Sequence, residues 1–201
     1  MASLVLCYHA VSPTWEHRLS IHPELLLRQV RMLSRFRRVH ITFDDAFRSA
    51  ANVFGELQQL GLPITVFVCT GLARDGTPLA ISELAGDDPQ ELATMTWDEL
   101  RELDVGSHGI THAHLARLSD EELRRELVGS KQQIEDELGR VCRDFAYPFG
   151  EHDERVRAAV RAAGYERAYG LVDDGKDPYA LRRLDLYRRH TPVRALLRLY
   201  G

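Results

Sequence analysis

The sequence predicts an α/β protein in which parallel strands alternate with helices, in a number close to that of a barrel. Two observations support this fold class. Short apolar runs, several of them rich in β-branched residues, alternate with segments whose apolar residues recur at helical spacing. Capping residues and glycines mark the boundaries between these segments. With 201 residues and no internal repeat, the chain is expected to form one domain over residues 1–201.

The expected elements follow from local patterns. Apolar runs predict strands over residues 4–8, 39–43, 64–68, 105–108, 145–147, 168–172 and 181–186. Helical spacing, capping boxes and terminal glycines predict helices over residues 23–36, 46–61, 96–103, 119–139, 156–164 and 192–200. Residues 70–95 show no regular pattern and are expected to form a long loop over one rim.

Composition and charge narrow the class of protein. The chain is 44% hydrophobic and 28% charged, which is ordinary for a folded globular protein. Its formal net charge of −4 gives no general attraction to nucleic acid, and the arginine-rich segments 28–38 and 182–198 are interpreted as solvated faces. The three cysteines lie in apolar runs and are expected to be buried. The N-terminal apolar stretch is too short for a signal peptide or a membrane span, so a cytoplasmic location is expected.

Two adjacent carboxylates, Asp44 and Asp45, end the strand predicted over residues 39–43. Side chains at the C-terminal ends of barrel strands converge on one face. Neighbouring carboxylates repel each other unless a cation lies beside them, so a metal ion or a fixed arginine is expected here. The alternative is that one of them only caps a helix beginning at Ala46, although a cap needs a single aspartate.

His108 and His112 follow another predicted strand and form the second candidate group. They bind one ion together if the segment coils as a single helical turn, because side chains at i and i+4 then share a face. Two surface histidines are the alternative. Two imidazoles and one carboxylate leave open positions on a divalent ion, which is typical of a catalytic site.

Four motifs together resemble the polysaccharide deacetylase family, the metal-dependent carbohydrate esterases related to chitooligosaccharide deacetylases. They are Tyr8-His9-Ala10-Val11, Thr42-Phe43-Asp44-Asp45, Ser107-His108 through His112 with Leu115, and Phe145-Ala146-Tyr147-Pro148-Phe149-Gly150. They occur in the family's order, include the Tyr-His motif of one branch, and cover residues 3 to about 187 with their connecting helices. The resemblance implies a distorted (β/α)7 barrel that removes acetyl groups from acetylated sugars.

The resemblance also implies roles for single residues. Asp45, His108 and His112 match the family's metal ligands, and Asp44 matches the general base that takes a proton from the attacking water. The backbone amide of Phe149 matches the oxyanion donor. The implied cofactor is one divalent metal ion. Zinc suits this ligand set best, while cobalt, nickel and iron stay open.

The chain departs from the family pattern at three positions near these motifs. Ala46 stands where glycine is common, Gly109 where serine or threonine is usual, and Ala146 where many members carry an arginine that holds the catalytic aspartate. Arg183, in the last predicted strand, is expected to orient Asp44 instead. The alternative for Arg183 is an exposed position on an edge strand.

The family's usual general acid, a histidine in a Leu-x-His run near the C-terminus, is missing, because the context of His190 does not match. His9 is the candidate acid, since it ends the first predicted strand; alternatively it is a buried histidine satisfied by backbone groups. Phe149, Tyr147 and Trp97 are candidates for oxyanion and substrate contacts. For Trp97, core packing is the alternative.

These observations predict a divalent-metal-dependent hydrolase that removes acetyl groups from an N-acetylated saccharide, such as a glycan or precursor containing N-acetylglucosamine. Two alternatives stay open. In the first alternative, the chain is a degenerate member of the fold that binds carbohydrate without turnover. In the second, it hydrolyses the amide of a small molecule that is not a sugar. The expected partner is an acetylated saccharide, with no nucleic acid and no membrane span, and the oligomeric state is left open.

Overall fold

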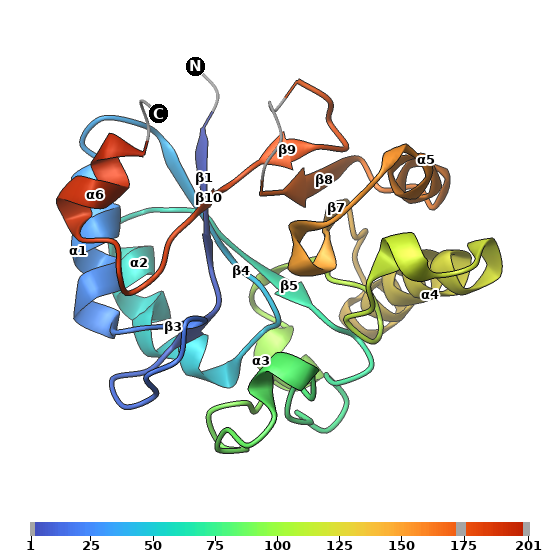
Figure 1. The fold of residues 1–201 in the computed structure, drawn as a ribbon, viewed down its shortest axis with the longest axis horizontal. Helices are drawn as coiled ribbons and strands as arrows, with labels where there is room; N and C mark the ends of the chain where they lie inside the picture. The colour runs from blue at the N-terminus through green and yellow to red at the C-terminus, as the bar shows by residue number, and fades with distance from the viewer. Residues whose placement is uncertain (1–2, 172–175, 199–201) are drawn as a thin grey trace.

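The computed structural model describes residues 3–171 and 176–198. Within them, eight parallel strands form one sheet in the order β10-β1-β4-β5-β6-β7-β8-β9, which curls into a nearly closed barrel (Figure 1). The strands are β1 (Leu4–Tyr8), β4 (Val39–Phe43), β5 (Ile64–Val68), β6 (Asp104–Ser107), β7 (Asp144–Ala146), β8 (Arg167–Gly170), β9 (Leu181–Arg182) and β10 (Leu184–Asp185). The predicted barrel of parallel βα units is therefore confirmed.

The barrel closes through one interrupted segment near the C-terminus. Strand β9 pairs with β8, whereas β10 pairs with β1, and Arg183 stands between the two short strands. Counted as one broken strand, β9 and β10 complete seven strand positions around the barrel. The strand predicted over residues 181–186 therefore lies where it was expected, but it is interrupted at Arg183.

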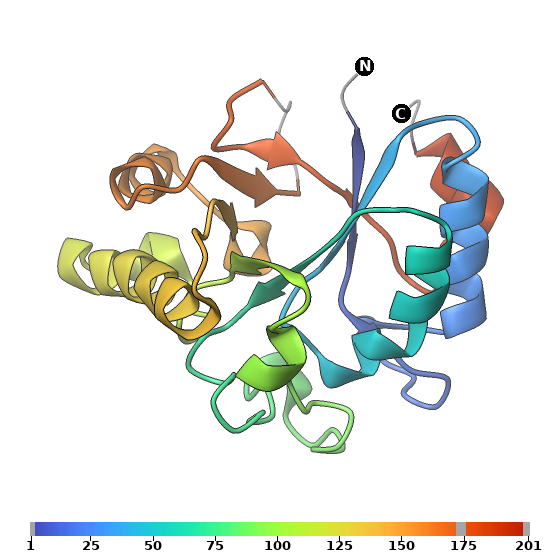
Figure 2. The ribbon, with the colours of Figure 1, turned by 180° about the vertical axis from the view of Figure 1, so that it is seen from behind.

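Six α-helices of the described chain cover the outside of the barrel. They are α1 (Pro23–Leu33), α2 (Phe54–Gln59), α3 (Trp97–Leu100), α4 (Asp120–Leu138), α5 (Glu154–Ala162) and α6 (Pro192–Leu197). Helices α1 and α6 lie side by side on one flank, while α4 and α5 cover the opposite flank (Figures 1 and 2). No helix in this part of the chain is long and apolar enough to cross a membrane.

Capping explains where two of these helices begin. The side chain of Ser119 accepts from the backbone N–H of Glu122, and the Glu122 carboxylate accepts from the backbone N–H of Ser119, so α4 starts with a capping box. Helix α3 starts in the same way with Thr96 and Glu99. Gly139 then ends α4 in the left-handed region, at φ 66°. These features match the sequence signals at both helices.

Strand register brings the functional motifs to one edge of the barrel. Tyr8 pairs with Phe43 at the C-terminal ends of β1 and β4, so His9 and Asp44 follow at the same edge. Ser107 ends β6 and pairs with Phe145 of β7, which places His108 beside them. The apolar core lies between these strands and the covering helices, where Leu6, Ile41, Phe43, Val66 and Phe145 are fully buried and Phe43 contacts Phe54 of α2.

One local expectation is corrected, and two short features are found that the sequence did not predict. Residues 46–61 do not form one helix; a 3₁₀ helix over Arg48–Val53 precedes α2, after two residues with positive φ, Asp45 and Ala46. A short parallel pair, β2 (Ala10–Val11) and β3 (Ser20–Ile21), was not expected from the sequence. The loop over residues 70–95 contains a single 3₁₀ turn, Ser82–Leu84, among the described elements. The predicted strand end at residue 172 and the predicted helix end at residue 200 lie outside the described residues.

Candidate active site

A cavity of about 310 Å³ opens where the carboxyl ends of the strands meet. Its lining includes His9, Asp44, Asp45, His108, His112 and Phe149. These residues come from the ends of β1, β4, β6 and β7, which are far apart in the sequence. The barrel topology therefore brings together most of the residues singled out in the four motifs.

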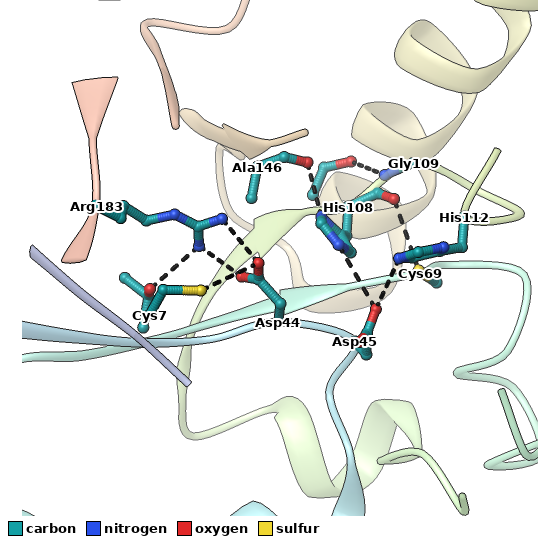
Figure 3. Close-up of polar contacts among 11 residues, drawn as sticks. Cys7, Asp44, Asp45, Cys69, His108, Gly109, His112, Ala146 and Arg183 are labelled. Carbon is teal, nitrogen blue, oxygen red and sulfur yellow. Dashed lines mark hydrogen bonds and ion pairs between the residues drawn. The ribbon is translucent and has the colours of Figure 1, made fainter. Parts of the chain in front are cut away.

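Asp44 forms a buried, bidentate ion pair with Arg183 (Figure 3). The guanidinium Nη1 donates to Oδ1 at 2.6 Å and Nη2 donates to Oδ2 at 2.7 Å. Arg183 is only 2% exposed, so the alternative of an arginine on an exposed edge is wrong. It reaches the barrel interior from the break between β9 and β10. This geometry fixes the orientation of the Asp44 carboxylate.

The charge state of Asp44 follows from that pair. Burial alone would raise the pKa of this carboxyl, but the Arg183 guanidinium more than offsets the burial and holds the pKa well below its usual range. Arg183 also donates to the Thr42 hydroxyl at 3.2 Å. Cys7, which burial keeps protonated by raising its pKa, donates to Asp44 Oδ2 with an Sγ–Oδ2 distance of 3.5 Å. Asp44 is therefore an ionised carboxylate with its cation already in place.

Asp45 has a different environment, next to His108 and His112. Its Oδ1 atom lies 3.1 Å from Nε2 of His112 and 3.6 Å from Nε2 of His108. All three side chains are buried. Among the described groups, none donates a well-aligned hydrogen bond to this Oδ1 atom. A buried carboxylate oxygen without a donor is costly unless a cation binds it.

The tautomer of His108 suits a ligand role. Its Nδ1 atom lies 2.7 Å from the carbonyl oxygen of Ala146, which can only accept, so Nδ1–H donates and the Nε2 lone pair points toward Asp45. Burial lowers the pKa of His108 to about 4, which leaves the imidazole neutral. Neutral imidazoles and carboxylates are the ligands that divalent ions such as zinc take in proteins. The residues present therefore fit a divalent metal ion.

The expected helical turn between the two histidines is absent. Gly109 has φ +81° and His112 has φ +60°, so residues 108–112 form a loop that turns through the left-handed region. The two imidazoles still meet, with ring centroids 5.1 Å apart. The two histidines share a site because of these unusual backbone angles rather than because of helical spacing.

Glu126 of α4 holds this loop, although no sequence motif pointed to it. Its Oε2 atom accepts from the backbone N–H of Ile110 at 2.6 Å and of Thr111 at 3.1 Å. Its Oε1 atom accepts from the Thr111 hydroxyl at 2.7 Å. A Cβ atom at Gly109 would lie 2.9 Å from Glu126 Oε2, so glycine suits this position on two grounds, contact and positive φ. The one available signal was an acid on the apolar face of a helix, between Leu123 and Leu127.

His9 and Phe149 border the same cavity. His9 is half-buried, and one of its ring nitrogens lies within 4.8 Å of both an Asp44 oxygen and Cys7 Sγ. These three atoms have the spacing of a ligand set, but Arg183 already neutralises Asp44, so a second cation there is disfavoured. Phe149 has φ +60° and contacts the His112 ring edge-on, with centroids 4.5 Å apart.

Two of the expected substrate contacts are placed elsewhere. Tyr147 is fully buried, and its hydroxyl donates to the carbonyl oxygen of Tyr179 at 2.7 Å. Trp97 packs in the core at the start of α3 and does not line this cavity. Residue type suggests both contacts, but it does not say which way a side chain faces. In contrast, His114 stacks on Phe149 with centroids 3.8 Å apart and borders the cavity.

Several solved structures share this architecture. The deacetylase PplD of Streptococcus pyogenes, determined in complex with acetate, matches with a TM-score of 0.79 and 18% identity, covering 97% of this chain and 96% of that one. A de-N-acetylase from Aggregatibacter actinomycetemcomitans matches with a TM-score of 0.76 and 16% identity, covering 93% of this chain and 95% of that one. IcaB from Ammonifex degensii matches with a TM-score of 0.74 and 20% identity, covering 96% of this chain and 95% of that one. At these identities the likeness shows a shared fold.

The sequence itself carries a family match. The model of the family described as polysaccharide deacetylase matches residues 34–168, which is more than half of the chain. The matched range includes Asp44, Asp45, His108 and His112, whereas His9 and Arg183 lie outside it. The chain belongs to the polysaccharide deacetylase family.

Proposed function

We propose that this protein is a divalent-metal-dependent deacetylase that releases acetate from an N-acetylated saccharide, such as a glycan or precursor containing N-acetylglucosamine. Family membership supports deacetylation of acetylated sugars. The proposal depends on one observation. The cavity holds an ionised aspartate paired with arginine, beside a second aspartate and two histidines whose ligand atoms lie within 4.8 Å of one another, with no well-aligned donor to Asp45 Oδ1 among the described groups. The first group suits a base and the second suits a metal ion.

Asp45, His108 and His112 would hold the ion. Two imidazoles and one carboxylate suit zinc and leave positions open for other ligands. A divalent ion in such a site supplies Lewis acidity, which makes water more acidic and polarises an acetyl carbonyl. Glu126 contributes indirectly, because its hydrogen bonds hold the loop that presents both histidines.

Asp44 would act as the general base. It is ionised, it lines the cavity, and its orientation is fixed by two hydrogen bonds from Arg183. In this role it takes the proton of the water that attacks the acetyl carbonyl carbon. Arg183 keeps the carboxylate charged and aimed, and it therefore acts as a positioning residue.

Two further groups would serve the carbonyl oxygen and the leaving nitrogen. The backbone N–H of Phe149 is proposed to donate to the carbonyl oxygen as negative charge develops on it. His9, at the cavity edge near Asp44, is proposed to give a proton to the departing nitrogen. The C–N bond then breaks, which yields acetate and a free amine. That PplD was solved with acetate is consistent with this product class.

The test is acetate release from a panel of N-acetylated and O-acetylated oligosaccharides, with a simple non-sugar acetamide added to the panel. We expect release from an N-acetylated sugar, loss of release after treatment with a chelator, and recovery when zinc is restored. Release that persists after the metal is removed would contradict the mechanism. Metal binding without release from any substrate would favour the carbohydrate-binding alternative, and release from the acetamide alone would favour the small-amide alternative.

A further inference from the structure

The fold brings two arginine-rich segments together on one flank of the barrel. Residues 22–38 include α1, and residues 187–198 include α6; the two helices pack side by side (Figures 1 and 2). Together these segments hold nine arginines and one acidic residue, a formal charge of +8. Since the whole chain carries −4, the remaining residues carry −12. From the sequence, the overlapping segments 28–38 and 182–198 are interpreted separately as solvated faces, whereas the fold brings the two together.

Most arginines on this flank are not neutralised within the protein, although Arg188 pairs with Glu16. The other eight are exposed and make no ion pair with any described residue. Six of these eight are here called the basic face: Arg28, Arg31, Arg35, Arg37, Arg38 and Arg194. Many arginines elsewhere on the chain are paired, for example Arg143 with Glu166 and Arg155 with Asp120. Charge of one sign that is left unpaired over a continuous surface favours an anionic partner.

Apolar side chains are interspersed with these arginines. A groove of about 340 Å³ between α1 and α6 is lined by Arg28, Arg31 and Arg35 together with Met32, Pro192 and Val193. Arg35 also borders an adjoining hollow with Arg37, Arg38 and Phe36. Phe36, Val193 and Leu197 are among the exposed large apolar residues, with exposures of 56%, 58% and 64%. Arginines that flank exposed apolar side chains are typical of surfaces that lie on a lipid bilayer.

The opposite flank has the opposite charge. Helix α4 carries seven acidic and three basic residues. Such a charge asymmetry orients a protein near a charged surface, with the basic face inward and the acidic helix toward water. We propose that the basic face docks this protein on a bilayer rich in anionic phospholipids, with Phe36 and Val193 entering the headgroup region.

The experiment is flotation of the full chain with two kinds of vesicle, one of phosphatidylcholine alone and one of equimolar phosphatidylcholine and phosphatidylglycerol. We expect binding to the phosphatidylglycerol vesicles only, with loss of binding as salt shortens the screening length to about 3 Å at 1 M. Absence of binding to the anionic vesicles, or equal binding to both kinds, would overturn the proposal.

A matched pair of triple variants identifies the face. Replacing Arg28, Arg31 and Arg35 with glutamine should weaken vesicle binding by roughly a hundredfold, because each surface arginine contributes roughly fivefold. The control replaces Arg74, Arg117 and Arg124 with glutamine; these are exposed arginines outside the face, and the net charge changes by the same amount. The control should stay within about twofold of the wild type. An equal loss in both variants would mean that overall charge, and not this face, drives binding.

Two further measurements distinguish docking on lipid from general binding of polyanions. Phe36→Ser combined with Val193→Ser should lower vesicle binding while leaving the charge unchanged, and no change would contradict insertion of apolar side chains. Binding of a short DNA duplex that matches vesicle binding and competes with it would indicate a general polyanion site and overturn the lipid assignment. Thermal unfolding of every variant should match the wild type, because all substituted side chains are exposed.

Discussion

Asp44 and Asp45 are neighbours in sequence, yet they lie in opposite electrostatic surroundings. Asp44 has two hydrogen bonds from a buried guanidinium at 2.6 and 2.7 Å. Asp45 faces two imidazoles, and its Oδ1 atom has no well-aligned donor among the described groups. The Asp44 carboxylate is paired with the Arg183 guanidinium, whereas the Asp45 carboxylate is placed to bind a metal ion. The adjacent pair therefore divides into two functions because only one of its members meets Arg183.

Local backbone geometry makes this division possible. Asp45 has φ +65°, which turns its side chain away from the direction that the strand gives to Asp44. Asp44 can then pair with Arg183 while Asp45 meets the histidines at the end of β6. Positive φ in a residue other than glycine costs free energy, and such strain clusters at functional sites.

The largest effect on turnover is expected for Asp44→Asn. The amide cannot accept the proton of the attacking water, so the rate of acetate release should fall by roughly 10²–10⁴. Leaving Arg183 buried without its anion should also lower the free energy of unfolding by roughly 3–5 kcal/mol. Steady-state kinetics and urea unfolding measure the two effects, and turnover within a few-fold of the wild type would show that Asp44 is not the base.

Arg183→Met tests whether the arginine holds and charges Asp44. Without the guanidinium, burial dominates and the pKa of Asp44 rises, so the carboxyl stays protonated to higher pH. The acidic limb of the pH–rate profile should therefore move to higher pH, and turnover at neutral pH should fall by roughly 10² because the carboxylate is also less well oriented. A profile with an unchanged acidic limb would mean that Arg183 is only structural.

His9→Ala should give a smaller loss of turnover, about 10² at most, through loss of the proposed proton donor. Metal content should stay as in the wild type, because His9 lies outside the Asp45 group. Activated substrates whose leaving group needs no proton should lose less rate than amides do. An equal loss for both kinds of substrate would remove His9 from the role of acid.

Glu126→Ala should have the smallest effect on chemistry and a distinct effect on the metal. Loss of three hydrogen bonds frees the loop that carries His108 and His112, so the Kd for zinc should rise by roughly tenfold or more. With saturating zinc, kcat should recover to near the wild-type value. Glu121→Ala, an exposed substitution on the same helix, is the control. Equal zinc affinity in both variants would contradict this role for Glu126.

The sequence predicts most of the barrel and the chemistry-bearing groups because their signals are local. The apolar runs that end at Asp44 and His108 mark strand ends, and parallel βα order places those ends on one edge. Arg183 was anticipated only as a candidate, since its burial depends on a break in the last strand that apolar content does not reveal.

Other features depend on long-range packing or on backbone angles. The positive φ values at Asp45 and His112 have no residue-type signal, so a helical turn was expected where a loop forms. Glu126 acts across the gap between α4 and the loop, and its partners are not predictable from spacing. Trp97 and Tyr147 have the right chemistry for sugar contacts, but the packing of their elements turns both into the core.

The most direct test of the division between the two aspartates is calorimetric zinc titration of Asp44→Asn and Asp45→Asn side by side, starting from metal-free protein. We expect Asp44→Asn to bind one equivalent of zinc with nearly wild-type affinity, whereas Asp45→Asn should lose affinity by at least about tenfold. Equal weakening in both variants, or weakening confined to Asp44→Asn, would contradict the assignment of one carboxylate to the base and the other to the metal.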